Sequence, residues 1–233
     1  IYSASYSIGM MATFFLKPIS FVLFPTISEL WEEGKVNKVK YYIKKSVEYY
    51  LLLAIPSIFG TYYLAPFVLK LLATEAFVTD RILILFITLG FLFTGIYQIF
   101  LYVVHLKEKT KYLPLIFGLV AIINLGLNFI LVPSLGISGA AIATFISYLI
   151  QTVIIVFFSM KLLFINFHLK YFFKVIISSV VMFVFLSFFS PNNFFQIIFL
   201  IGGGGSIFFC MMFIINGIKK RDVNLLKRMV FSD

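Results

Sequence analysis

Long apolar runs alternate with short polar stretches along the whole chain. A helix needs about 20 apolar residues to cross about 30 Å of hydrocarbon, and most of these runs are long enough. The sequence therefore predicts an all-α integral membrane protein of about seven transmembrane helices, with no room for a soluble domain. The predicted spans lie near residues 5–27, 47–73, 82–105, 112–132, 137–160, 172–189 and 195–216.

Composition supports the membrane class and changes how the charge is interpreted. The chain is 62% hydrophobic and 12% charged, whereas a soluble domain is roughly half apolar and a quarter charged. The core of a soluble protein of this size could not bury the 31 Phe and 13 Tyr of the chain, so the surplus apolar surface is expected to face lipid. The net charge of +10 is what basic cytoplasmic loops produce, and we expect no nucleic-acid partner.

The positions of the basic loop residues predict the orientation in the membrane. Lys and Arg gather in the first, third and fifth loops, near residues 35–45, 107–111 and 161–174, and in the tail at 219–228. The second loop has only Arg81, and the fourth and sixth have no charge. Because basic loops stay in the cytoplasm, we expect a cytoplasmic-membrane protein with the N-terminus of the chain outside and the C-terminus inside.

The first loop, residues 28–46, is itself patterned. Val36, Val39, Ile43 and Val47 fall on one stripe, with lysines beside it, which predicts an amphipathic helix. Two interpretations fit: a helix lying on anionic lipid of the inner leaflet, or an ordinary linker between two spans.

Four segments resemble a known family through their order and spacing. They are Phe24–Leu30, Ala54–Pro56, Asn124–Pro133 and Leu135–Thr144. Together they resemble the C-terminal half of lipid-linked oligosaccharide flippases in the multidrug/oligosaccharidyl-lipid/polysaccharide exporter superfamily. That group includes the O-antigen and the teichoic- or teichuronic-acid repeat-unit transporters involved in polysaccharide biosynthesis.

The resemblance implies the C-terminal lobe of a two-lobed transporter of about twelve to fourteen helices. Residues 1–160 would form its five-helix bundle, and residues 161–233 would add two helices and a basic tail. The N-terminal lobe would then be missing. The chain opens on Ile1 rather than Met, which also suggests a fragment.

The implied function is a flippase that moves lipid-linked glycan repeat units by alternating access, and not an enzyme. No cofactor is expected, and the coupling ion is left open between H⁺ and Na⁺. An exporter of small cations or drugs is the alternative, although acidic residues near mid-span are lacking. A membrane glycan polymerase or ligase is disfavoured because the outer loops are too short to hold an active site.

Lys17 is the sharpest candidate for substrate binding. It lies near the middle of the first predicted span and is followed by Pro18. A lysine at the centre of a bilayer costs roughly 2.5–3.5 kcal/mol on insertion scales, and such residues usually face a water-filled cavity. A cation there suits the diphosphate of a lipid-linked sugar. The alternative is a lysine satisfied by backbone carbonyls or by snorkelling along a kink at the proline.

Five other polar residues within spans are weaker candidates. Asn124 and Asn128 share a helix face, which fits either a cavity wall or interhelical hydrogen bonding. Tyr97, Gln98 and Tyr102 form a polar stripe that suits either sugar hydroxyls or packing. The Gly202–Gly205 run lies in an apolar span without a following Lys, so we expect either close packing or a flexible point there and no nucleotide site. No metal-ligand spacing is present.

Overall fold

The computed structural model describes residues 6–7, 9–10, 16–72, 81–167 and 169–218, and their secondary structure is helical. The helical class predicted from the sequence is confirmed. Five helices are long and apolar enough to cross a membrane, and the longest of them reverses direction within its length. The described residues thus contain five to six apolar helices, and the predicted count of seven is not established.

The elements are α2 Leu16–Glu32, α3 Val36–Leu72, α4 Arg81–Leu106, η3 Thr110–Tyr112, α5 Leu113–Leu162, α6 Leu169–Ser187 and α7 Phe194–Ile214.

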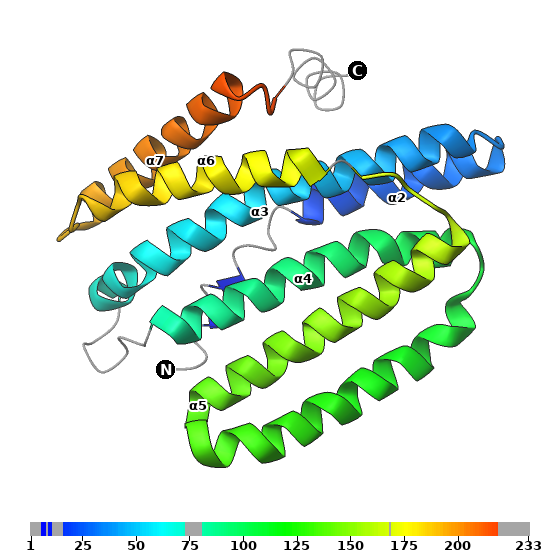
Figure 1. Ribbon diagram of the computed structural model, residues 1–233, viewed down its shortest axis with the longest axis horizontal. Coiled ribbons are helices and arrows are strands. Elements are labelled where there is room, and N and C mark those ends of the chain that lie inside the picture. Colours follow the sequence, from blue (N-terminus) through cyan, green and yellow to red (C-terminus); the bar gives the residue numbers. More distant parts are fainter. Residues whose placement is uncertain (1–5, 8, 11–15, 73–80, 168, 219–233) are drawn as a thin grey trace.

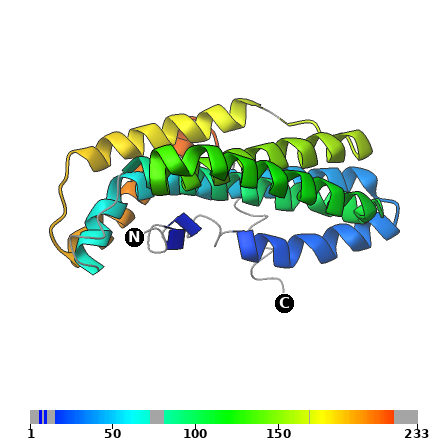
Figure 2. The same ribbon diagram turned by 90° about the horizontal axis from the view of Figure 1, so that it is seen from below.

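The helices are arranged around α3 and α4, which pack against each other (Figure 1). On one side α5 packs along α4, and on the other α6 packs along α3, with α7 following α6. The helix α2 forms an antiparallel pair with the first part of α3 (Figure 1). In Figure 2, α2 and α6 lie on opposite sides of the α3–α4 pair.

Helix α3 has 37 residues, which at 1.5 Å per residue gives a length of about 55 Å. The hydrocarbon of a bilayer is about 30 Å thick, so α3 extends well beyond it. The predicted amphipathic segment and the second predicted span are therefore one unbroken helix, which starts directly after a tight turn at Gly34. Val39, Ile43 and Val47 of its apolar stripe are buried in the protein core together with Leu23 and Ile27 of α2, so these side chains do not lie on lipid.

Helix α5 is a helical hairpin rather than one rod (Figure 1). Gly136 has φ 56° and ψ −131°, a left-handed backbone that favours glycine, and the chain reverses there. The two arms, residues 113–135 and 137–162, correspond to the fourth and fifth predicted spans. At the tip, a Cβ on Gly139 would collide with the carbonyl oxygen of Leu131, so only glycine allows the two arms to approach this closely.

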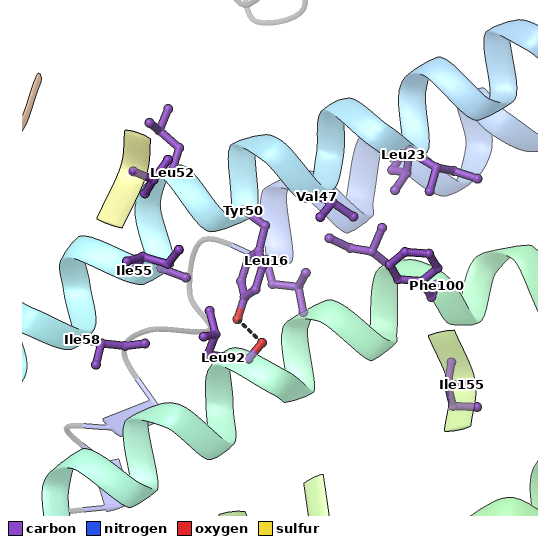
Figure 3. Packing of buried hydrophobic residues seen from close by; sticks show 14 of the residues in the cluster. Leu16, Leu23, Val47, Tyr50, Leu52, Ile55, Ile58, Leu92, Phe100 and Ile155 are labelled. Atoms are coloured by element: carbon purple, nitrogen blue, oxygen red, sulfur yellow. Dashed lines mark hydrogen bonds between the residues drawn. The ribbon is translucent and has the colours of Figure 1, made fainter. Parts of the chain in front are cut away.

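The centre of the bundle is a cluster of buried apolar side chains from α2, α3, α4 and α5 (Figure 3). Tyr50 lies in this cluster. Its hydroxyl donates a hydrogen bond that is shared between the carbonyl oxygens of Phe91 and Leu92, at 3.1 and 3.2 Å. The Tyr50 ring occupies the space that a side chain at Gly95 would need. This contact fixes the register of α3 against α4.

At the far end of the bundle, Tyr63 joins three elements. Its hydroxyl donates a hydrogen bond to the carbonyl of Phe189, which follows α6. Its ring contacts Phe183 of α6, and the Arg81 guanidinium at the start of α4 lies 5.5 Å from the ring centre. At the opposite end, Lys174 of α6 donates to the carbonyl of Asn216, just after α7, at 3.0 Å.

Candidate functional site

An apolar cavity of about 380 Å³ lies between α3, α6 and α7. Two of its lining residues carry hydroxyls, and both are already bonded to the α3 backbone. Ser57 donates to the carbonyl of Leu53 and Thr61 to that of Ser57, each at 2.7 Å. The wall consequently offers almost purely apolar surface. The lining residues are Leu52, Leu53, Pro56, Ser57, Gly60, Thr61, Leu64, Ala65, Val68, Met182, Leu186, Leu200, Ile201, Gly204, Gly205, Phe208 and Phe209.

Glycines on two facing helices provide the space for this cavity. A Cβ on Gly60 of α3 or Gly205 of α7 would meet no atom within 4 Å. By contrast, a Cβ on Gly204 would lie 3.2 Å from a methyl carbon of Leu186, so that glycine lets α7 approach α6. The glycine run of α7 thus serves close packing on one face and a cavity on the other. The sequence suggested the close packing but did not predict the cavity.

Lys17 lies in the first turn of α2, with its side chain exposed. Its neighbour Leu16 is buried in the cluster that contains Tyr50 and Leu92 (Figure 3). Residues 11–15 of the first predicted span lie outside the described part of the chain, so the depth of Lys17 within that span stays a prediction. The kink predicted at Pro18 stays a prediction for the same reason.

The polar stripe of α4 is half-buried. Tyr97 packs against the core cluster, and Gln98 is one helical turn from Tyr102. The ring of Tyr102 contacts Phe24 of α2, with centroids 5.1 Å apart, and Phe24 also contacts His105. Tyr102 therefore takes part in the α2–α4 contact, and the proposed role of this stripe in binding sugar remains a prediction.

Asn124 and Asn128 lie on the first arm of the α5 hairpin. Asn124 donates its amide to the Ser147 hydroxyl of the second arm at 3.0 Å. Asn128 donates to the backbone carbonyl of Asn124 at 2.8 Å and to its side-chain oxygen at 3.2 Å. The two amides form a hydrogen-bonded chain that joins the arms. A further role in substrate binding is untested.

The structure separates these candidates into distinct places. Lys17 is exposed on α2, Tyr102 of the α4 stripe lies at the α2–α4 contact, and the two asparagines join the arms of the α5 hairpin. None of the six lines the apolar cavity. Within the described residues, no group of three His, Cys, Asp or Glu side chains could hold a metal ion.

A bundle of apolar, membrane-length helices with an apolar cavity between them defines a multi-pass membrane protein. The comparisons identify its family. This chain belongs to the lipid II flippase MurJ family, whose family model matches residues 2–229. The predicted relationship to lipid-linked glycan flippases is thereby confirmed, while the narrower assignment to O-antigen or teichoic-acid transporters is not.

A solved structure of lipid II flippase MurJ in an inward closed conformation has the same fold, with a TM-score of 0.70 and 24% sequence identity. The match covers 94% of this chain and 48% of that chain. The uncharacterized membrane protein MJ1068 of Methanocaldococcus jannaschii is 28% identical over 151 residues, which is 65% of this chain and 30% of that protein. The chain thus spans about half the length of the solved flippase and about a third of the curated relative.

Proposed function

We propose that the protein translocates a lipid-linked glycan across the cytoplasmic membrane by alternating access. The substrate class is a polyprenyl-type lipid joined through a diphosphate to a sugar head, either a peptidoglycan precursor or a polysaccharide repeat unit. Membership of the lipid II flippase family supports the class of transporter. The observation that carries the proposal is the apolar cavity between α3, α6 and α7.

The cavity suits the lipid tail of such a substrate rather than its head. Its wall presents apolar surface, and its two lining hydroxyls are bonded to backbone carbonyls. Lipid tails are as apolar as such a wall, so a tail passes from the bilayer into the cavity at little cost. The cavity would keep the tail in apolar surroundings while the polar head crosses elsewhere.

The head would cross beside α2. Lys17 would offset the diphosphate charge, and the half-buried stripe of Tyr97, Gln98 and Tyr102 would contact the sugar. Phe24 already connects α2 to this stripe through Tyr102. The chain covers 48% of the solved flippase, which is consistent with a second lobe. In this proposal the second lobe would face α2 and complete the pathway. Asn124 and Asn128 would hold the two arms of the α5 hairpin together where the hairpin packs against α4.

The experiment uses the full-length gene product in hosts that lack their own flippase. One host needs peptidoglycan precursor transport to grow, and the other needs repeat-unit transport to display a surface polymer. Rescue of growth would assign a peptidoglycan precursor, and rescue of the surface polymer would assign a repeat unit. If neither host is rescued although the protein reaches the membrane, the flippase proposal fails.

Filling the cavity tests the role of the tail site directly. The double variant Gly60→Leu with Gly205→Leu places two side chains where the structure has open space, and we expect it to abolish rescue. Gly118→Leu with Gly126→Leu is the matched control, because it also adds two leucines at open helical glycines, but both lie on α5, outside the cavity. Equal rescue by the wild type, the variant with the filled cavity and the control would show that no lipid tail uses this cavity.

A further inference from the structure

Lysines at one end of the bundle lie over aromatic rings. The Lys107 ammonium is 4.5 Å from the ring centre of Trp31, that of Lys111 is 5.3 Å from Tyr112, and that of Lys161 is 4.4 Å from Phe157. A cation over an aromatic face is attracted by about 0.5–1 kcal/mol at exposed sites. The rings therefore restrict where these ammonium groups lie.

Lys111 and Lys161 belong to the two ends of the α5 hairpin, whereas Lys107 follows α4 and lies over Trp31 of α2. Lys111 precedes the first arm, and Lys161 lies in the last turn of the second. The two ends of the hairpin meet where the Tyr112 ring contacts Phe158, with centroids 5.6 Å apart and the rings at 69°. Both lysines are exposed and share this end of the hairpin.

Neither lysine is neutralised by a carboxylate within the described part of the chain. The ion pairs found there join Lys35 to Glu33 and Lys45 to Glu48, both on the α2–α3 pair. An ammonium over a ring keeps N–H donors on the side away from the ring. Lys111 and Lys161 thus offer two positive charges with donors available for an anion.

The surface beside these lysines is apolar and exposed. Leu115 of the first arm is 73% exposed, and Val153 and Phe157 of the second are 59% and 61% exposed. Charged groups that border an exposed apolar belt, with a tyrosine between them, lie where lipid headgroups meet the hydrocarbon. The α5 hairpin is on the opposite side of the molecule from α6 and α7, which line the cavity (Figure 1). The partner is accordingly a lipid of the surrounding bilayer and not the transported one.

We propose that Lys111 and Lys161 form a binding site for the phosphate of an anionic phospholipid on the outer surface of the α5 hairpin. The phosphate accepts hydrogen bonds from both ammonium groups. The acyl chains lie along the exposed apolar side chains of the two arms. Tyr112 and Phe157 hold the lysines in place at the level of the headgroups.

The test measures the affinity of the full-length protein for phosphatidylglycerol, by native mass spectrometry of the purified protein during titration with that lipid. A hydrogen bond to a charged group contributes at least about 1.5 kcal/mol, or about tenfold in affinity. We expect Lys111→Gln or Lys161→Gln alone to weaken binding about tenfold and the double variant about 100-fold. The matched control is Lys109→Gln with Lys170→Gln, which removes two exposed charges from the same end of the bundle, and we expect less than a twofold change.

Two further measurements separate a built site from general charge attraction. Tyr112→Leu keeps both lysines and removes one ring, and we expect it to weaken binding about two- to fivefold. Millimolar inorganic diphosphate should leave the bound phospholipid in place, because the acyl chains also hold it. The proposal would be overturned if the double variant and its control lost affinity equally, or if neither lost affinity. Displacement of the phospholipid by diphosphate would also overturn it. Neither lysine lines the cavity, so this experiment and the transport experiment succeed or fail separately.

Discussion

Lys17 is exposed in the first turn of α2, directly beside the buried Leu16. A hydrogen bond to a charged group contributes about 1.5–3 kcal/mol, which corresponds to roughly tenfold or more in rate. If Lys17 holds the substrate diphosphate, we expect Lys17→Ala to reduce transport about tenfold or more and Lys17→Arg to retain most of it. Transport is measured by rescue of the flippase-deficient host at matched membrane levels of protein.

Lys38→Ala is the control for this prediction, because Lys38 is also an exposed lysine but lies in α3 before the second predicted span, which begins near residue 47. Loss of transport in both variants would indicate a general effect of charge. Full transport by Lys17→Ala would show that this lysine is structural.

At the residue scale, sequence predicts which side chains share a helix face but not what they meet. The spacing of Asn124 and Asn128 correctly placed them on one face. Their partner Ser147 lies 23 residues from Asn124 and reaches it only because the chain reverses at Gly136. The same holds for Tyr50 and Gly95, whose fit depends on how α3 crosses α4.

The α5 hairpin is the element whose geometry depends most on single residues. A Cβ at Gly139 would collide with the backbone carbonyl of Leu131, which cannot move aside as a flexible side chain would. Overpacking of this kind typically costs about 1–3 kcal/mol. We expect Gly139→Ala to lower the melting temperature of the purified protein, measured in one detergent throughout.

Gly126→Ala provides the comparison on the same hairpin. Its Cβ would meet no atom within 4 Å, and alanine favours a helix over glycine by about 1 kcal/mol. The melting temperature of this variant should stay equal or rise. A similar decrease in both variants would mean that α5 responds to helix propensity and not to the tight tip.

At the element scale, the apolar runs predicted most helices to within a few residues, because a membrane span requires a long apolar stretch. The prediction separated residues 28–46 from the second span, since lysines interrupt the apolar run there. The structure continues the helix through them because the buried stripe of Val39, Ile43 and Val47 keeps helical spacing and packs with α2. The cavity was not predictable, because it exists only where three helices meet.

The whole molecule has two unlike ends. The α2–α3 turn and both ends of the α5 hairpin, with their lysines, lie at one end of the bundle, and the α6–α7 connection lies at the other (Figure 1). Basic residues near membrane spans favour the cytoplasmic side. We expect green fluorescent protein fused after Gly217 to fluoresce and alkaline phosphatase inserted after Ser190 to be active. The reverse pattern would contradict the proposed orientation.

The hydrogen bond from Tyr63 to the Phe189 carbonyl also sets an order of assembly during synthesis. The two residues are 126 positions apart, and chains grow at about 5–20 residues per second, so about 6–25 s separate their appearance. The arms of α5 meet through local contacts and can pair as soon as both have emerged. The α3 wall of the cavity, in contrast, is open to the bilayer until α6 and α7 arrive. We therefore expect acyl chains of the surrounding membrane to lie against this face of α3 before α6 and α7 complete the cavity.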